Sequence, residues 1–149
     1  MKKNILTMMC IVLIIGVLCS CGEELKTDRL GSLQIKISSE WEKVENKEED
    51  SKDYLLDYKY NSAELRIDAI HKKEVGSLEE FEENVTAGYG DVESELLEID
   101  NHTCAYFDLE DKEILHIQTS NFFYILTYTK STETPEDFTE IIKRIKIKE

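Results

Sequence analysis

Proline, cysteine and basic residues are all scarce in this chain of 149 residues. One proline and six glycines exclude collagen-like and proline-rich low-complexity classes. Acidic residues number 32 against 18 lysines and arginines, which gives a formal charge of −14 at pH 7. Because phosphate binding needs a basic face, this balance argues against nucleic acid as a partner. Hydrophobic residues make up 41% of the chain, enough for a folded core.

The N-terminus has the three zones of a secretory signal peptide. Lys2 and Lys3 supply positive charge, and a 14-residue apolar run from Ile5 to Leu18 leads into small residues. Fourteen residues of helix rise about 21 Å, less than the roughly 30 Å hydrocarbon core of a bilayer. We therefore interpret residues 1–20 as a removable signal. An uncleaved anchor helix is the alternative.

The end of this signal resembles the lipobox of bacterial lipoproteins. Leu18-Cys19-Ser20-Cys21 has an aliphatic residue and two small residues before a cysteine, although Cys19 stands where Ala, Ser or Thr is usual. The resemblance implies cleavage before Cys21, a diacylglyceryl group on the Cys21 thiol, and often acylation (palmitate) of the new amine. It places the protein on the extracytoplasmic face of the cell membrane. An acidic body that anionic lipid repels needs such a covalent tether.

The mature chain is expected to contain a linker and one domain. Residues 21–31 are predicted to be the lipid anchor and a polar leader that reaches about 30 Å when extended, followed by a single domain over residues 32–149. After cleavage only Cys21 and Cys104 remain, and Cys21 is occupied by its thioether. An internal disulfide is therefore excluded, and the hydrophobic core must stabilise the domain.

Hydrophobic periodicity predicts an α+β domain. Ser77 to Glu80 form a capping box that opens one helix, and Thr134-Pro135 is predicted to start a last helix. The last helix buries Phe138, Ile141, Ile142 and Ile145. The element order β-β-β-α-β-β-β-β-α, with short turns, predicts a mostly antiparallel sheet of about six to seven strands covered by two helices. The strands are expected at 33–37, 54–60, 64–71, 93–99, 103–110, 113–119 and 122–129, the last being the central one.

This order and several short motifs resemble the PsbP/Mog-type fold, an α/β/α sandwich. The resemblance implies a domain that binds or assists other proteins and is not an enzyme. Family members usually have Pro three residues before the Trp and Gly at the turn, where this chain has Ser38 and Asn101. The matching motifs are a strand leading into Trp41, the acidic helix start at 77–81, Ile99-Asp100-Asn101 before Cys104-Ala105, and the closing helix at 138–145.

The sequence carries no motif for phosphate binding, a nucleophile elbow, HExxH zinc binding or an EF-hand. His71, His102 and His116 are scattered without a ligand spacing, so they predict neither a metal nor a cofactor site. Cys104 lies two residues from His102, which would suit a nucleophile, but a small buried hydrophobe is the favoured interpretation. The sequence accordingly predicts no catalytic residue, no metal site and no cofactor site.

Between residues 74 and 113 there are 14 acids and one base, Lys112. This region suggests a weak cation site or a surface for a basic partner, but a solvated acidic face is favoured because no ligand spacing is present.

Seven tyrosines and Trp41 could form a recognition patch. More simply, they are expected to fill a thin core with hydroxyls at its rim.

The leading interpretation is a non-catalytic, membrane-tethered domain that binds another envelope protein or supports its assembly. The alternative is a small-ligand or cation-binding accessory lipoprotein of a transporter. A third interpretation, an enzyme that uses Cys104, is the least favoured.

Overall fold

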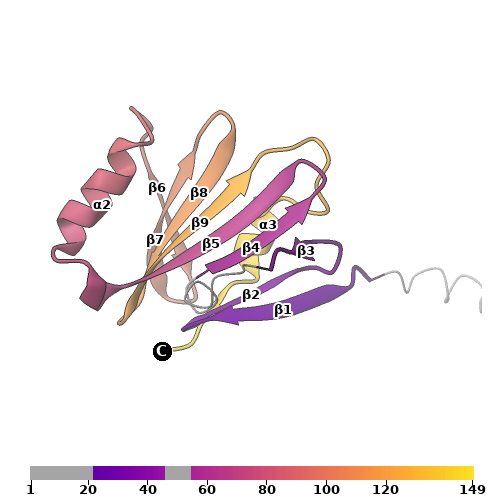
Figure 1. The fold of residues 1–149 in the computed structure, drawn as a ribbon, viewed down its shortest axis with the longest axis horizontal. Helices are drawn as coiled ribbons and strands as arrows, with labels where there is room; N and C mark the ends of the chain where they lie inside the picture. Colours follow the sequence, from indigo (N-terminus) through magenta and orange to yellow (C-terminus); the bar gives the residue numbers. More distant parts are fainter. Residues whose placement is uncertain (1–21, 46–54) are drawn as a thin grey trace, which may run out of the picture.

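The structure, a computed structural model, describes residues 22–45 and 55–149. Its strands form two antiparallel sheets (Figure 1). A large sheet has the order β3-β4-β5-β9-β8-β7-β6, and a small sheet has the order β1-β2-β10. The elements are β1 Leu25–Leu30, β2 Leu33–Ser38, β3 Glu42–Lys43, β4 Leu55–Tyr60, β5 Ala63–His71, α2 Leu78–Ala87, β6 Glu95–Ile99, β7 His102–Asp108, β8 Lys112–Gln118, β9 Phe122–Thr129, α3 Phe138–Lys143 and β10 Lys146–Ile147.

Short turns between alternating strands produce the antiparallel order of the large sheet. The β6–β7 hairpin turns at Asp100-Asn101, where both residues have positive φ (49° and 66°). This is the type I′ geometry that matches the twist of a hairpin, and Asn and Asp tolerate it better than most residues. Strand β9 pairs with β5 on one side and β8 on the other, which confirms its predicted central position.

One face of the large sheet, here called the core face, packs against the small sheet and α3. Leu65, Ile67 and Ala69 of β5 lie on this face, as predicted from their spacing, and all three are buried. Residues of β2 and the buried stripe of α3 complete the core. Phe138, Ile141 and Ile142 form the α3 stripe as predicted, and Ile145 is buried with them but lies after the helix, which ends at Lys143.

The opposite face of the large sheet, here called the α2 face, is covered only in part. The ring of Phe81 meets Phe123 edge to face at 5.5 Å between centroids, and Tyr89, just after α2, meets Phe107 at 5.1 Å. No residue of α2 itself is buried. Figure 1 shows α2 at the side of the molecule opposite β1–β3. The predicted α+β class, with a mostly antiparallel sheet of six to seven strands and two helices, is thus confirmed.

Two predicted boundaries were wrong. The polar leader at 21–31 is not a free linker, because Leu25–Leu30 forms strand β1, paired with β2 along its whole length. The last helix begins at Phe138 and not at Thr134-Pro135. The chain before it is irregular and bent, and the hydroxyls of Thr134 and Tyr128 both donate to the Glu136 carbonyl. Cys21 and the predicted signal lie outside the described residues.

Candidate functional site

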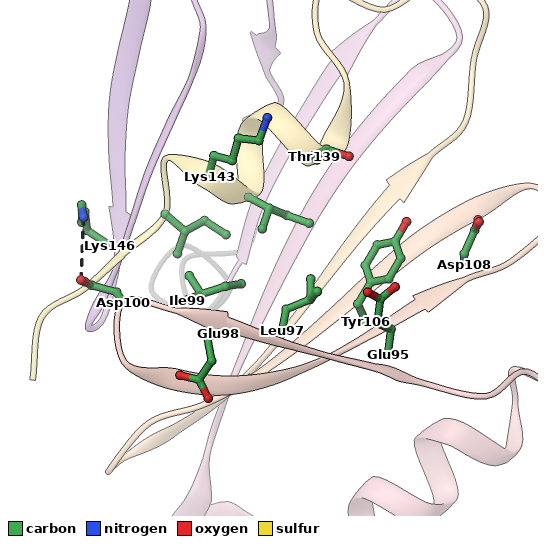
Figure 2. Close-up of a pocket in the computed structure, with 12 residues that line it drawn as sticks. Glu95, Leu97, Glu98, Ile99, Asp100, Tyr106, Asp108, Thr139, Lys143 and Lys146 are labelled. Carbon is green, nitrogen blue, oxygen red and sulfur yellow. Dashed lines mark ion pairs between the residues drawn. The ribbon is translucent and has the colours of Figure 1, made fainter.

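A cleft in the described part of the chain lies between the edge strand β6 and the last helix (Figure 2). Its volume is about 640 Å³. Strand β6 and the neighbouring β7 form one wall, and α3 with the start of β10 forms the other. The local sequence explains this arrangement, because the α3 stripe and alternate β6 residues all point toward the core. The apolar floor consists of Leu97, Ile99, Ile142 and Ile145.

Charged side chains surround this floor. Lys146 lies 3.7 Å from Asp100, and Lys143 lies 2.6 Å from Glu140, so both lysines have acidic partners in their own chain. The Ile147 backbone N–H donates to the Asp100 carboxylate at 2.8 Å, and this bond lowers the pKa of Asp100 together with the charge of Lys146. Glu95 also lines the cleft. The ion pairs found within the described residues include neither Glu95 nor its neighbour Glu98.

The tyrosine hydroxyl in the cleft wall is poorly suited to proton transfer. Tyr106 donates its O–H to Glu113, and its pKa is raised first by burial and then by that hydrogen bond. It stays protonated near neutral pH and acts as a hydrogen-bond donor. The cleft therefore offers an apolar floor with fixed charges around it, an arrangement that suits binding.

The structure separates Cys104 from the imidazole of His102. Cys104 is buried, and its Sγ lies 3.5 Å from the backbone carbonyl of His102. The imidazole nitrogens of His102 face other groups, the Asp100 carbonyl at 3.0 Å and Glu149 at 3.5 Å. Burial, with a smaller effect of Glu98, raises the pKa of the Cys104 thiol to about 11. The thiol is thus protonated at neutral pH, as expected for a small buried hydrophobe.

The other two histidines lie in different places. His71 ends β5 and meets the ring of Phe122 at 5.0 Å. His116 lies beneath α2, 2% exposed, with its Nε2 2.9 Å from the Tyr89 hydroxyl. Burial lowers the pKa of His116 to about 4, so the ring is neutral at pH 7. In residues 22–45 and 55–149, no three His, Cys, Asp or Glu side chains converge to hold a metal ion.

A second groove, of about 530 Å³, lies on the α2 face between α2 and the β6–β7 hairpin. Phe107, Ala105 and Val92 supply its apolar surface, and acids of α2 line the other side. Much of the acidic region predicted at residues 74–113 thus gathers around this groove and β6. The acids of α2 that line the groove are Glu79, Glu82 and Glu83.

Sequence reasoning missed the importance of β6 as an edge. Leu96 is 70% exposed, more than the two other exposed large hydrophobic side chains of the described residues, Leu25 (41%) and Val92 (36%). The signal available in the sequence was Leu96-Leu97, two adjacent leucines in an alternating strand, one of which must face outward. Three of the seven tyrosines fill the core as predicted, Tyr60, Tyr89 and Tyr106 are half-buried, and Tyr54 lies outside the described residues. Tyr58, Tyr124 and Tyr128 are buried, and their hydroxyls bond to Asp28, the Leu30 carbonyl and Thr134.

Comparisons with known proteins give a fold likeness and no family. No protein-family profile matches the chain, and no curated protein matches it. A solved structure from Bacteroides thetaiotaomicron is similar, with a TM-score of 0.52 and 15% sequence identity, over 85% of this chain and 49% of that chain. This chain thus spans about half the length of that one, and the likeness concerns the fold alone. No helix of the described residues is long and apolar enough to cross a membrane.

Proposed function

We propose that this protein is a lipoprotein, anchored through Cys21 to the extracytoplasmic face of the cell membrane, whose domain binds another envelope protein without catalysing a reaction. The lipobox-like Leu18-Cys19-Ser20-Cys21 supports the anchor. The observation that carries the binding function is the exposed Leu96 on the edge strand β6, beside the apolar cleft. Exposed apolar surface with a polar surround is typical of interaction sites.

The position of β1 changes the expected distance of the domain from the membrane. Strand β1 begins at Leu25, four residues after Cys21. Four residues span at most about 14 Å, so an acylated Cys21 would hold the domain close to the lipid headgroups. A partner is therefore expected to be a membrane protein or another protein held at the same surface.

The side chains that could serve as a nucleophile, acid or base support a non-catalytic function. The Cys104 thiol and the Tyr106 hydroxyl both have raised pKa values, and the buried His116 has a lowered one. At neutral pH these groups are in their uncharged forms. A nucleophile or general base would instead need a pKa near the working pH and a substrate-facing position.

The anchor and the binding surface can be tested separately. Mass spectrometry of the protein from cells should find a lipid-modified Cys21 at the N-terminus, and an intact Met1 end would contradict the anchor. For the binding surface, a photo-crosslinking residue at position 96 in the tethered protein should yield a reproducible adduct with one envelope protein. Lys36 is also exposed but lies on β2, so the same residue at position 36 is the matched control.

A small-ligand lipoprotein that assists a transporter remains the second candidate function. The volume of the cleft, about 640 Å³, falls in the range of small-molecule sites. A ligand that binds only the folded state would raise the melting temperature. Calcium-dependent melting of the protein, with no crosslink from position 96, would favour this alternative.

We also propose that the domain has the PsbP/Mog-type fold. Its support is the helix on each face of an antiparallel sheet, together with the motifs around Trp41 and the Asp100-Asn101 turn. An experimental structure in which strand order or helix placement departs from that family would contradict this assignment.

A further inference from the structure

Strand β6 is an edge that the described structure leaves open. It ends the large sheet, and no other described strand pairs with its outer side. In antiparallel pairing, every second residue of such a strand points its backbone N–H and C=O groups outward, where another strand can pair with them. Strand β6 has five residues, whereas β3 at the opposite end of the sheet has two. Among the strands of residues 22–45 and 55–149, the large sheet therefore offers a full strand-length edge only at β6.

The edge of the small sheet at β1 is protected in a way that β6 is not. Strand β1 turns the side chains of Lys26 and Asp28 inward, where Asp28 accepts a hydrogen bond from Tyr58 at 2.5 Å. Inward-pointing charges are a device by which natural sheets discourage a further strand. Strand β6 has one charged residue on its inward face, Glu95, but Glu95 is exposed, whereas Lys26 and Asp28 of β1 are half-buried. The other inward residues of β6, Leu97 and Ile99, are apolar, and Leu96 is exposed on its α2 face. Strand β6 thus has the composition of a strand that can be extended.

Apolar surface is present on both faces of β6. On the core face, Leu97 and Ile99 continue into the cleft floor formed with α3 (Figure 2). On the α2 face, Leu96 pairs across the hairpin with Ala105, which lines the second groove with Val92. Successive side chains of an added strand point to opposite faces of the sheet. One face of such a strand would therefore meet the cleft, and the other would meet Leu96 and the α2 groove.

The negative charge around β6 determines which kind of added strand can bind there. Residues 91–98 contain four acids and no base. The groove beside them is lined by Glu79, Glu82 and Glu83 of α2. The two lysines of the cleft, Lys143 and Lys146, have acidic partners in their own chain. A second copy of β6 would bring the same acids together, and like charges across a strand pair are destabilising. The surface therefore favours a basic partner over self-association.

We propose that β6 accepts an extended lysine- or arginine-rich segment of another protein as an added outer strand. Apolar side chains of the segment lie over the cleft, and its basic side chains lie on the side of Glu98 and the α2 groove. This inference rests on the proposed protein-binding function and names the chemistry of the partner. Main-chain hydrogen bonds supply affinity in such strand addition, and alternate side chains supply specificity.

The probe is a short synthetic peptide of alternating valine and lysine, added to the full-length protein in uncharged detergent micelles. We expect binding by fluorescence anisotropy, with slower hydrogen exchange of the β6 amides. Glu98→Lys should weaken binding about five- to tenfold. Glu40→Lys makes the same charge change at an exposed site after β2 and should weaken binding less than twofold. A peptide of the same composition with its valines and lysines in separate blocks should bind more weakly.

Several outcomes would overturn the inference. Equal loss of binding in Glu98→Lys and Glu40→Lys, or unchanged exchange of the β6 amides, would mean general charge attraction without strand addition. Protection of β6 that rises with protein concentration alone would identify a second copy as the occupant. If crosslinking from position 96 succeeds while these tests fail, the protein-binding function stands and only the basic strand is wrong. If position 96 also yields no adduct, the proposed function fails as well. Thermal melting of Glu98→Lys checks that the variant is folded.

Discussion

The two ends of the large sheet differ in how completely they are covered. At the β4 end, Trp41 is 1% exposed, and its ring meets Tyr60 and Tyr128 edge to face at 6.5 and 6.3 Å. At the β6 end, Leu96 is 70% exposed, and the nearby helix α2 has no buried residue. The protein thus stabilises one end of its sheet with a closed core and leaves apolar surface accessible at the other.

Polar groups show the same difference. At the β4 end, the buried carboxylate of Glu136 accepts hydrogen bonds from the Ser38 N–H at 2.6 Å and the Trp41 indole at 3.2 Å, and it pairs with Arg144. The bonds from Ser38 and Trp41 join segments far apart in the sequence. At the β6 end, the ion pairs of the described residues leave out Glu95 and Glu98. The Thr103 hydroxyl donates a hydrogen bond to Glu98 at 2.7 Å, within the β6–β7 hairpin. The polar contacts of Glu136 therefore tie distant segments together at the β4 end, whereas the acids of β6 are held by a local contact or by no ion pair.

The largest expected effect comes from breaking the closed end. Trp41→Ala removes a fully buried aromatic ring and leaves a cavity, so it should lower the free energy of unfolding by about 3–5 kcal/mol. Leu96→Ala removes an exposed side chain and should change it by less than about 0.5 kcal/mol. Denaturant unfolding of the two variants measures both values. Similar losses in the two variants would contradict the proposed difference between the ends.

A second prediction concerns pH and the α2 face. Burial lowers the pKa of His116 to about 4 from an ordinary 6.5. The unfolded state therefore binds a proton more readily than the folded state between these pH values, and stability should fall as pH drops from about 6.5 toward 4. The loss is on the order of 2–3 kcal/mol at pH 4. Unfolding curves at a series of pH values measure it.

His116→Phe is the control for this prediction. It keeps a ring in contact with Phe107 and Phe123 but cannot be protonated. The loss of stability between pH 6.5 and 4 should therefore be smaller in this variant. Asp57 acts in the opposite direction, because burial and the nearby Glu64 raise its pKa. Its contribution is present in both proteins and cancels in the difference. Identical pH profiles would show that His116 does not titrate on unfolding.

Local patterns predicted much of this fold because they depend on near neighbours. The alternation in β5, the stripe of α3 and the Asp100-Asn101 turn each follow from spacing or backbone preference within one element. Strand β1 could not be predicted in this way. Its sequence LKTDRL lacks apolar alternation, and its structure depends on pairing with β2.

The candidate site was less predictable than the fold. Its composition was visible as an acidic region, but its geometry depends on strand order. No local sequence pattern indicates that β6 ends the large sheet or that α3 lies opposite Leu97.

The start of α3 was predicted wrongly for a related reason. Proline is a common first helical residue, yet Tyr128 and Thr134 donate hydrogen bonds to the Glu136 carbonyl, and the chain at Pro135 is bent and not helical.

The last prediction concerns the N-terminal caps of the two helices, which differ in their side-chain hydrogen bonds. The Ser77 hydroxyl accepts a hydrogen bond from the Glu80 N–H at 3.3 Å and caps α2, whereas the N-cap of α3, Asp137, makes no such side-chain bond. Ser77→Ala should therefore destabilise α2 by about 1 kcal/mol, while Asp137→Ala should cost α3 less. Because no residue of α2 is buried, we expect this helix to open locally. Its amides should exchange about fivefold faster in Ser77→Ala, with β5 and β9 unchanged. Equally faster exchange in those central strands would mean that α2 unfolds only together with the core.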